Sequence, residues 1–301
     1  MADSGMTFQT VRDFHPEVLR LFDSYVHGWL SRSEFIAGAD RFAGVGATGQ
    51  TLLEALSPNF AAATQVPPDE SRLHARYVEV PSPVGHGRIR GYLVKRADSS
   101  GKLPGVLVVH ENRGLNPHIE DITRRIALEN FIAFAPDALS TLGGYPGDED
   151  KARELFATLD RGTVNLDFLA AAQYLRDLPQ VCGRYGATGF CFGGGTVNFL
   201  ATRLEDLDAA VPFYGNAAPV ADVPGIRAPL LIHYADSDDR VNAQWPAFES
   251  ALKAAGAVFE MHRYPGTQHG FNNDTTPRYD AAAAKLAWSR TITFFERQLR
   301  K

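Results

Sequence analysis

The sequence predicts an α/β fold, a mainly parallel sheet with helices on both faces, preceded by an N-terminal helical extension. From about residue 75 onward, short apolar segments alternate with segments of helical periodicity, a pattern typical of βαβ units. Residues 106–109 are apolar without interruption, as expected of a strand covered on both faces. The 301 residues are 45% hydrophobic and 22% charged, which is typical of a globular protein of one or two domains.

Charge and composition exclude several classes of protein. The chain carries 30 Lys and Arg against 35 Asp and Glu, a net charge of −5, which argues against a nucleic-acid partner. It has no uncharged apolar run of about 18 residues, so we expect no membrane span. Two cysteines are too few for a disulfide framework, so each is a packed or a reactive thiol.

Residues 1–70 are predicted to form a helical extension and linker, and residues 71–301 the main domain. Apolar residues recur at helical spacing after Pro16, and the segment 65–70 contains two prolines and resembles a linker. The extension is too apolar for a free tail, so it packs on its own domain or on a second subunit; we favour a homodimer. Deleting it should lower stability and leave the chemistry of the main domain in place.

The segment Ser31–Ile36 faintly resembles a twin-arginine export signal. It has only one arginine of the pair, and Asp40 and Arg41 interrupt the apolar stretch that should follow. We therefore expect a cytoplasmic protein, with export as the minor alternative.

The main domain is predicted to begin with a hairpin of residues 77–80 and 89–94. Further strands and helices then alternate to the C-terminus. The expected strands are 106–110, 132–135, 185–188, 210–214, 230–234 and 259–262, and the expected helices are 118–129, 149–158, 163–176, 194–204, 245–255 and 278–298. In such sheets, ligands bind where loops leave the carboxyl ends of the strands.

Cys191 is the candidate nucleophile. It is the centre of Gly-Phe-Cys-Phe-Gly-Gly-Gly at 189–195, between a predicted strand and a predicted helix. A tight strand-to-helix turn would project its side chain above the sheet, and the helix N-terminus would favour thiolate. The N–H of Phe192 could then bind an oxyanion. The alternative is an inert buried cysteine; Cys182 has no comparable surroundings and is predicted to be structural.

A cysteine nucleophile needs a base and a carboxylate that orients it. His269 lies in a turn-rich loop after the last strand, whereas His233 is expected in the core and His262 on a strand face. Asp238 is the preferred acid in the loop after strand 230–234. Its competitors are Asp236 and Asp239.

With these residues, the sequence resembles the dienelactone hydrolase family of the α/β-hydrolase superfamily. Two further segments, His110–Asn116 and Ala135–Leu139, are similar to loops of that family, and together the matches span roughly residues 75–298. Residues 1–70 look like the extension of a longer bacterial subgroup. The resemblance implies an α/β-hydrolase fold and a small-molecule ester or lactone as the partner of residues 71–301, which become the catalytic domain.

The resemblance also implies roles for two residues after the third strand. Glu111 would contact the thiol and help to form thiolate, unless it only pairs with Arg113. Asn112 would give the second oxyanion N–H. The family's arginine soon after the catalytic histidine is missing, since the first arginine after His269 is Arg278. Neutral esters are therefore expected to react better than carboxylate-bearing ones. The candidate substrate-binding residues are Arg113, Tyr145, Phe213 and Tyr214.

We therefore predict a cysteine hydrolase of carboxylic esters or lactones that works through a thioester. No cofactor is expected, because no dinucleotide or P-loop motif occurs, and no metal, because His110-Glu111 lacks the second histidine of a zinc-binding helix. The alternatives are a thioesterase or peptidase on the same fold, or a non-catalytic binding protein.

Overall fold

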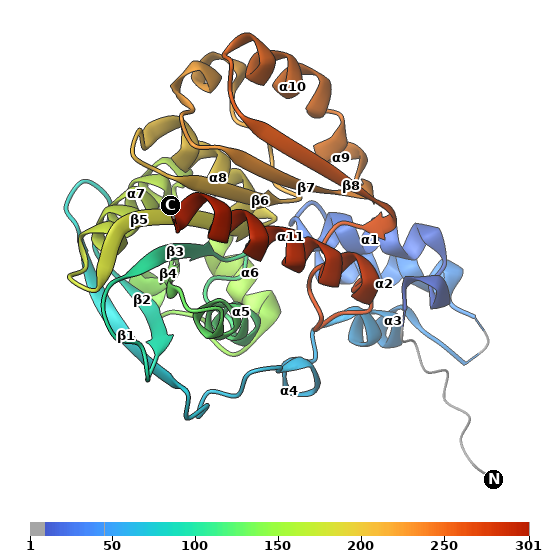
Figure 1. The fold of residues 1–301 in the computed structure, drawn as a ribbon. Coiled ribbons are helices and arrows are strands. Elements are labelled where there is room, and N and C mark those ends of the chain that lie inside the picture. Colours follow the sequence, from blue (N-terminus) through green and yellow to red (C-terminus); the bar gives the residue numbers. More distant parts are fainter. Residues whose placement is uncertain (1–9, 45, 301) are drawn as a thin grey trace.

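The computed structural model describes residues 10–44 and 46–300. Residues 1–9 and Val45 of the predicted extension, and Lys301 of the predicted main domain, lie outside the described residues. The main domain is built on an eight-stranded sheet in the order β1-β2-β4-β3-β5-β6-β7-β8 (Figure 1). β1 and β2 form an antiparallel hairpin, and β2 also pairs antiparallel with β4. The other five strand pairings are parallel, which confirms the predicted sheet. The strands are β1 (Leu73–Ser82), β2 (Gly87–Arg96), β3 (Leu103–Val109), β4 (Ile132–Asp137), β5 (Val181–Phe190), β6 (Ala209–Phe213), β7 (Leu230–Ser237) and β8 (Phe259–Gln268).

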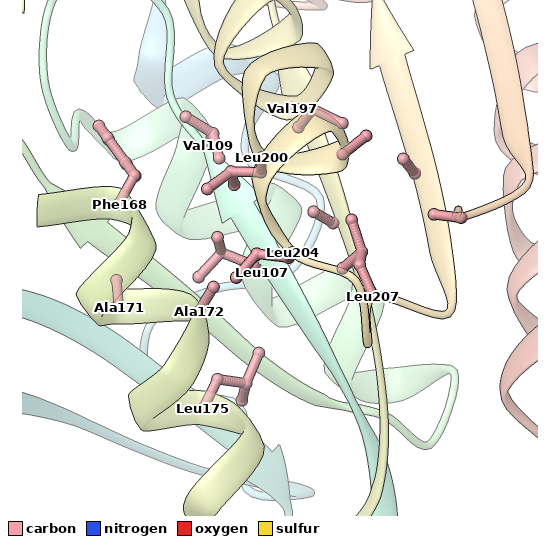
Figure 2. Close-up of a cluster of buried hydrophobic side chains, with 14 of the residues drawn as sticks. Leu107, Val109, Phe168, Ala171, Ala172, Leu175, Val197, Leu200, Leu204 and Leu207 are labelled. Carbon is pink, nitrogen blue, oxygen red and sulfur yellow. The ribbon is translucent and has the colours of Figure 1, made fainter. Parts of the chain in front are cut away.

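The sheet separates two hydrophobic cores, because successive side chains of a strand point to opposite faces. In β3, Leu107 and Val109 enter one core, and Val106 and Val108 enter the other. Figure 2 shows Leu107 and Val109 packed against side chains of two helices in the first core. Helices α6 (Glu149–Ala157), α7 (Arg161–Asp177), α8 (Phe192–Arg203) and α10 (Trp245–Ala254) cover that face, and α5 (Pro117–Leu128) and α11 (Ala281–Leu299) cover the opposite one.

The N-terminal helices form a third apolar cluster. Phe22, Phe35 and Leu56 are at most 4% exposed within it. The helices pack on their own chain: Arg153 Nη1 donates to the carbonyl oxygen of Tyr25 at 2.7 Å, and the guanidinium of Arg278 lies over the ring of Phe22. Figure 1 shows α1, α2 and α3 together at one side of the molecule. The apolar residues of the extension are largely covered within one chain, so they do not need a second subunit to cover them. The homodimer stays a prediction. The helices are α1 (Pro16–Val26), α2 (Arg32–Ala39), α3 (Gly49–Leu56) and α4 (Phe60–Ala63).

Two features of the structure concern the predictions about an export signal and a membrane span. Ser31, at the start of the segment considered as an export signal, caps α2: its hydroxyl accepts a hydrogen bond from the N–H of Glu34, and the Glu34 carboxylate accepts one from the N–H of Ser31. Within residues 10–44 and 46–300, no helix has both the length and the hydropathy needed to cross a membrane.

Candidate active site

Cys191 occupies a strained turn between β5 and α8. Its φ of 54° and ψ of −112° are unusual for a residue with a side chain, and such strain clusters at functional sites. The neighbouring glycines permit the turn, because a Cβ on Gly189 would collide with the backbone of Gly193, and a Cβ on Gly193 with the carbonyl oxygen of Val109. The structure therefore gives Cys191 the backbone of a nucleophile elbow.

Loops after two neighbouring strands bring an acid and a base together. Asp238 follows β7 and caps the short helix α9 (Asp239–Asn242), while His269 follows β8. Asp238 Oδ2 lies 2.6 Å from His269 Nδ1, and both side chains are buried. The competing acids are exposed, and Asp236 accepts a hydrogen bond from the N–H of Gly266 instead. Of the three acids, Asp238 is thus the one that orients His269.

The buried thiol and imidazole favour a charge-separated pair. Burial raises the pKa of Cys191, but the charge of His269 and hydrogen bonds to His269 and His27 outweigh it and lower the pKa to about 6. Burial also lowers the pKa of His269, but the thiolate and Asp238 raise it to about 10. Near neutral pH the pair is therefore thiolate and imidazolium.

Sequence reasoning missed one residue at the thiol, His27 of the extension. It follows α1, and its Nε2 lies 3.8 Å from Cys191 Sγ. No motif marks His27, and 163 residues separate it from Cys191, so only the three-dimensional structure reveals the contact. The extension thus contacts Cys191, and the expectation that its deletion leaves the chemistry of Cys191 in place stays a prediction.

The sequence analysis expected no metal site, but it did not foresee that His27 lies close to Cys191 and His269. The donor atoms of His27, Cys191 and His269 all lie within 4.8 Å of one another, and imidazole and thiolate are groups that Zn²⁺ accepts. The strained elbow and the His269–Asp238 pair equally suit acyl transfer, and the thiolate–imidazolium pair needs no ion to form. We therefore treat the three residues as acid–base groups.

The loop after β3 differs from what the resemblance implies. Glu111 Oε2 accepts a hydrogen bond from Asn273 Nδ2 at 3.0 Å, so the carboxylate is engaged by an amide and not by the thiol or by Arg113. The Arg113 guanidinium is buried: Nη1 donates to Asn112 Oδ1 at 2.6 Å, and Nε lies 3.6 Å from Glu149 Oε2. Arg113 therefore anchors the loop and is not positioned to hold a substrate.

A cavity of about 290 Å³ opens beside Cys191. Asn112 and Phe192, the expected oxyanion donors, both line it, and the N–H of Phe192 has no partner within α8 because it opens that helix. Arg161 and Arg240 also line the cavity, and its described lining includes no carboxylate. The sequence analysis sought an arginine soon after His269 and did not identify Arg161 or Arg240, which come from other segments of the chain.

Of the other candidate substrate-binding residues, only Tyr214 lines this cavity. Phe213 is 2% exposed, and its ring lies 4.3 Å from that of His233 in the core. The Tyr145 hydroxyl donates to Glu149 Oε1 at 2.9 Å, away from the cavity. The aromatic character of Phe213 and Tyr145 was a poor guide to substrate binding, because aromatic residues serve core packing equally well.

The structure also shows where His233 and the second cysteine, Cys182, lie. His233 is fully buried, as expected, and its Nδ1 lies 2.8 Å from the Tyr264 hydroxyl. Cys182 is exposed near the start of β5, so it is not the packed thiol that was predicted.

Comparisons with known proteins agree with this geometry. The family model "Dienelactone hydrolase family" matches residues 89–299, and the model "YqhI-like" matches residues 6–45. The chain is 57% identical over 113 residues to an Escherichia coli (strain K12) protein named as a hydrolase fragment, YghX, which spans 38% of this chain and 97% of that protein.

Two longer matches cover most of the chain. It is 32% identical over 257 residues to an Escherichia coli (strain K12) protein named "Putative carboxymethylenebutenolidase", covering 80% of this chain and 93% of that protein. The crystal structure of a dienelactone hydrolase-like promiscuous phosphotriesterase from metagenomic libraries matches with a TM-score of 0.66 and 26% identity, over 75% of this chain and 99% of that one. An α/β-hydrolase sheet, an elbow at residue 191 and a family match over 89–299 lead to one conclusion: the chain belongs to the dienelactone hydrolase family.

Proposed function

We propose that this protein hydrolyses carboxylic esters or lactones with Cys191 as the nucleophile and a thioester as the intermediate. The observation that carries the proposal is a buried thiol on a strained strand-to-helix turn, within 4.8 Å of a histidine that Asp238 orients. Three residues in these roles form the arrangement that activates a nucleophile for acyl transfer.

In the first half-reaction, the Cys191 thiolate attacks the acyl carbon and the carbonyl electron pair moves onto oxygen. The N–H groups of Asn112 and Phe192 bind the resulting oxyanion. When the tetrahedral intermediate collapses, the carbon–oxygen bond to the leaving alkoxide breaks, and the His269 imidazolium gives the alkoxide its proton. Cys191 then carries the acyl group as a thioester.

In the second half-reaction, neutral His269 removes a proton from water, whose oxygen adds to the thioester carbon. Collapse of this intermediate expels the Cys191 thiolate and releases the carboxylic acid. The proton remains on His269, so the thiolate–imidazolium pair is restored. Asp238 holds Nδ1 protonated throughout, which keeps Nε2 directed at the reacting atoms.

This mechanism predicts a bell-shaped dependence of kcat/KM on pH. Activity should rise with an apparent pKa near 6, because below it the thiol of Cys191 gains a proton and stops being nucleophilic. Activity should fall near pH 10, where His269 loses the proton that the leaving oxygen needs. Rates measured with an ester that does not itself ionise between pH 4 and 11 check both limbs. A profile that still rises between pH 7 and 9 would contradict a preformed thiolate.

The cationic wall of the cavity favours a substrate with a negative charge on its acyl part. Arg161 lies over Phe192, with its guanidinium carbon 4.7 Å from the ring centre, and no carboxylate in the described chain pairs with it. The name of the curated relative also indicates a carboxyl-bearing butenolide for that protein. We therefore propose carboxylate-bearing esters or lactones as the preferred class, in place of the neutral esters that the sequence alone led us to expect.

Replacing Arg161 with glutamine should raise KM for a carboxylate-bearing ester by roughly three- to tenfold, the value of one partly exposed ion pair. A neutral ester of the same size should be almost unaffected. Arg203→Gln is the matched control, because Arg203 is also an arginine, at the end of the helix that follows Cys191, but pairs with Asp222 outside the cavity. An equal change of KM for both esters would show that Arg161 acts on the fold of the site and not on substrate charge.

A thioesterase or peptidase would use the same residues. Comparing kcat/KM for oxygen esters, thioesters and amides that share one acyl group separates these activities, and the proposal expects the oxygen esters to react fastest.

A further inference from the structure

The extension ends α1 with an acid and a histidine that both lie at the active site. The His27 side chain is 11% exposed, and its Nδ1 lies 2.7 Å from the carbonyl oxygen of Asp23 and 3.4 Å from Asp23 Oδ1. Both oxygens can only accept hydrogen bonds, so Nδ1 carries a proton. The other ring nitrogen, Nε2, is thereby left to face Cys191 Sγ at 3.8 Å.

The position of His27 is fixed by groups of the catalytic domain. Asn112 Nδ2 donates to the carbonyl oxygen of Val26 at 2.8 Å, and Arg113 Nη1 donates to the same oxygen at 3.2 Å. Arg153 Nη1 holds the carbonyl oxygen of Tyr25. These carbonyls belong to the last turn of α1, and that of Tyr25 also accepts a hydrogen bond from the N–H of Gly28 at 3.0 Å. The donors therefore dock the end of α1 onto the loop that also supplies Asn112 to the cavity.

Several charged groups surround the His27 ring. Arg240 Nη2, which can only donate, lies 3.1 Å from Nε2, so this hydrogen bond forms while Nε2 is unprotonated and is given up when Nε2 carries a proton toward the thiolate. The His269 ring centre lies 5.0 Å from that of His27. Asp23 faces Nδ1, and Arg278 acts on Asp23 from a neighbouring loop. Arg240 and His269 oppose a charge on His27, whereas Asp23 and the thiolate favour it. Burial lowers the pKa of His27, but Asp23 and Cys191 outweigh it and raise the pKa to about 9.

We propose that His27 is a second catalytic histidine, delivered by the N-terminal extension, that holds Cys191 as thiolate from a side that His269 does not occupy. The inference rests on the proposed function, since it assigns His27 to the same nucleophile. In the resting protein the thiolate lies within 4.8 Å of two imidazoles, each paired with its own aspartate. During hydrolysis of the thioester, His27 would also stabilise the thiolate as it leaves the acyl carbon. The extension is then part of the active site.

The test is the pH dependence of alkylation of Cys191 by iodoacetamide, measured with EDTA present so that no metal bridges the site. All variants carry Cys182→Ser, because Cys182 is exposed and would react as well. In His27→Gln the midpoint of the rate curve should move up by about one pH unit, the effect of losing one neighbouring positive charge. In the same variant, kcat/KM at pH 7 should fall roughly tenfold.

The matched control is His15→Gln, which removes an exposed histidine from the opposite end of α1 and should leave the midpoint in place. Asp23→Asn retains the imidazole and should move the midpoint in the same direction by less, which keeps the proposal testable if His27→Gln folds poorly. Free imidazole should restore part of the activity of His27→Ala, as no purely structural role would allow. An unchanged midpoint and unchanged kcat/KM in folded His27→Gln would overturn the proposal.

Alkylation requires no ester turnover. Failure of this inference is therefore distinguishable from failure of the proposed function, which would appear as full hydrolysis by Cys191→Ala.

Discussion

Replacing Cys191 with alanine is expected to lower kcat/KM for an ester by about four to six orders of magnitude, because no other group can form the covalent intermediate. The fold should persist, since alanine is smaller than cysteine and fits the same turn, whose surroundings are glycine and backbone. Ester hydrolysis and thermal unfolding are measured on the same preparation, so that loss of chemistry is separated from loss of structure.

Cys182→Ala is the control for this experiment, because it removes the other thiol, which is exposed at the start of β5. It should retain full activity. If Cys191→Ala instead retains most of its activity while Cys182→Ala loses it, the nucleophile has been assigned to the wrong cysteine.

Asp238→Asn should cost about 10⁴-fold in kcat, the second largest effect that we expect. Asp238 Oδ2 accepts the Nδ1 proton of His269 at 2.6 Å, whereas an amide can present its own N–H there and turn the imidazole to the wrong tautomer. Asp236→Asn, in the same loop, should change kcat by less than about twofold, because that exposed side chain does not contact His269. Comparable losses in both variants would point to the loop as a whole and not to orientation of the base.

The sequence predicted the sheet well for a physical reason. Strands buried on both faces need continuous apolar residues, and 106–109 and 230–232 satisfy this need without reference to the rest of the chain. Gly189 and Gly193 are similarly local, since each is required by a backbone approach within a few residues or to the adjacent strand β3, whereas Gly194 is required by the carbonyl oxygen of Phe213 at the end of β6. The loops after β7 and β8 could be matched to Asp238 and His269 because neighbouring parallel strands end at one edge of the sheet.

The wrong predictions concern contacts between segments that are distant in the sequence. Whether an aromatic residue such as Phe213 lines a cavity or fills a core depends on which helix covers it. Arg161 reaches the cavity from the start of α7, far from the position after His269 where an arginine was sought. His27 approaches Cys191 only because Asn112 and Arg113 bind the end of α1. None of these relations leaves a local pattern in one sequence.

The central claim, a thioester on Cys191, is tested most directly by mass spectrometry of protein quenched in acid during turnover of a slow ester. The account predicts a mass increase equal to the acyl group, located by peptide mapping on the segment that contains Cys191 and removed by hydroxylamine. In His269→Gln the adduct should form more slowly, because the thiol loses the positive charge that favours thiolate, and once formed it should persist longer, because no base activates the water. Rapid turnover with no adduct at any quench time, or an adduct on a residue other than Cys191, would contradict the account.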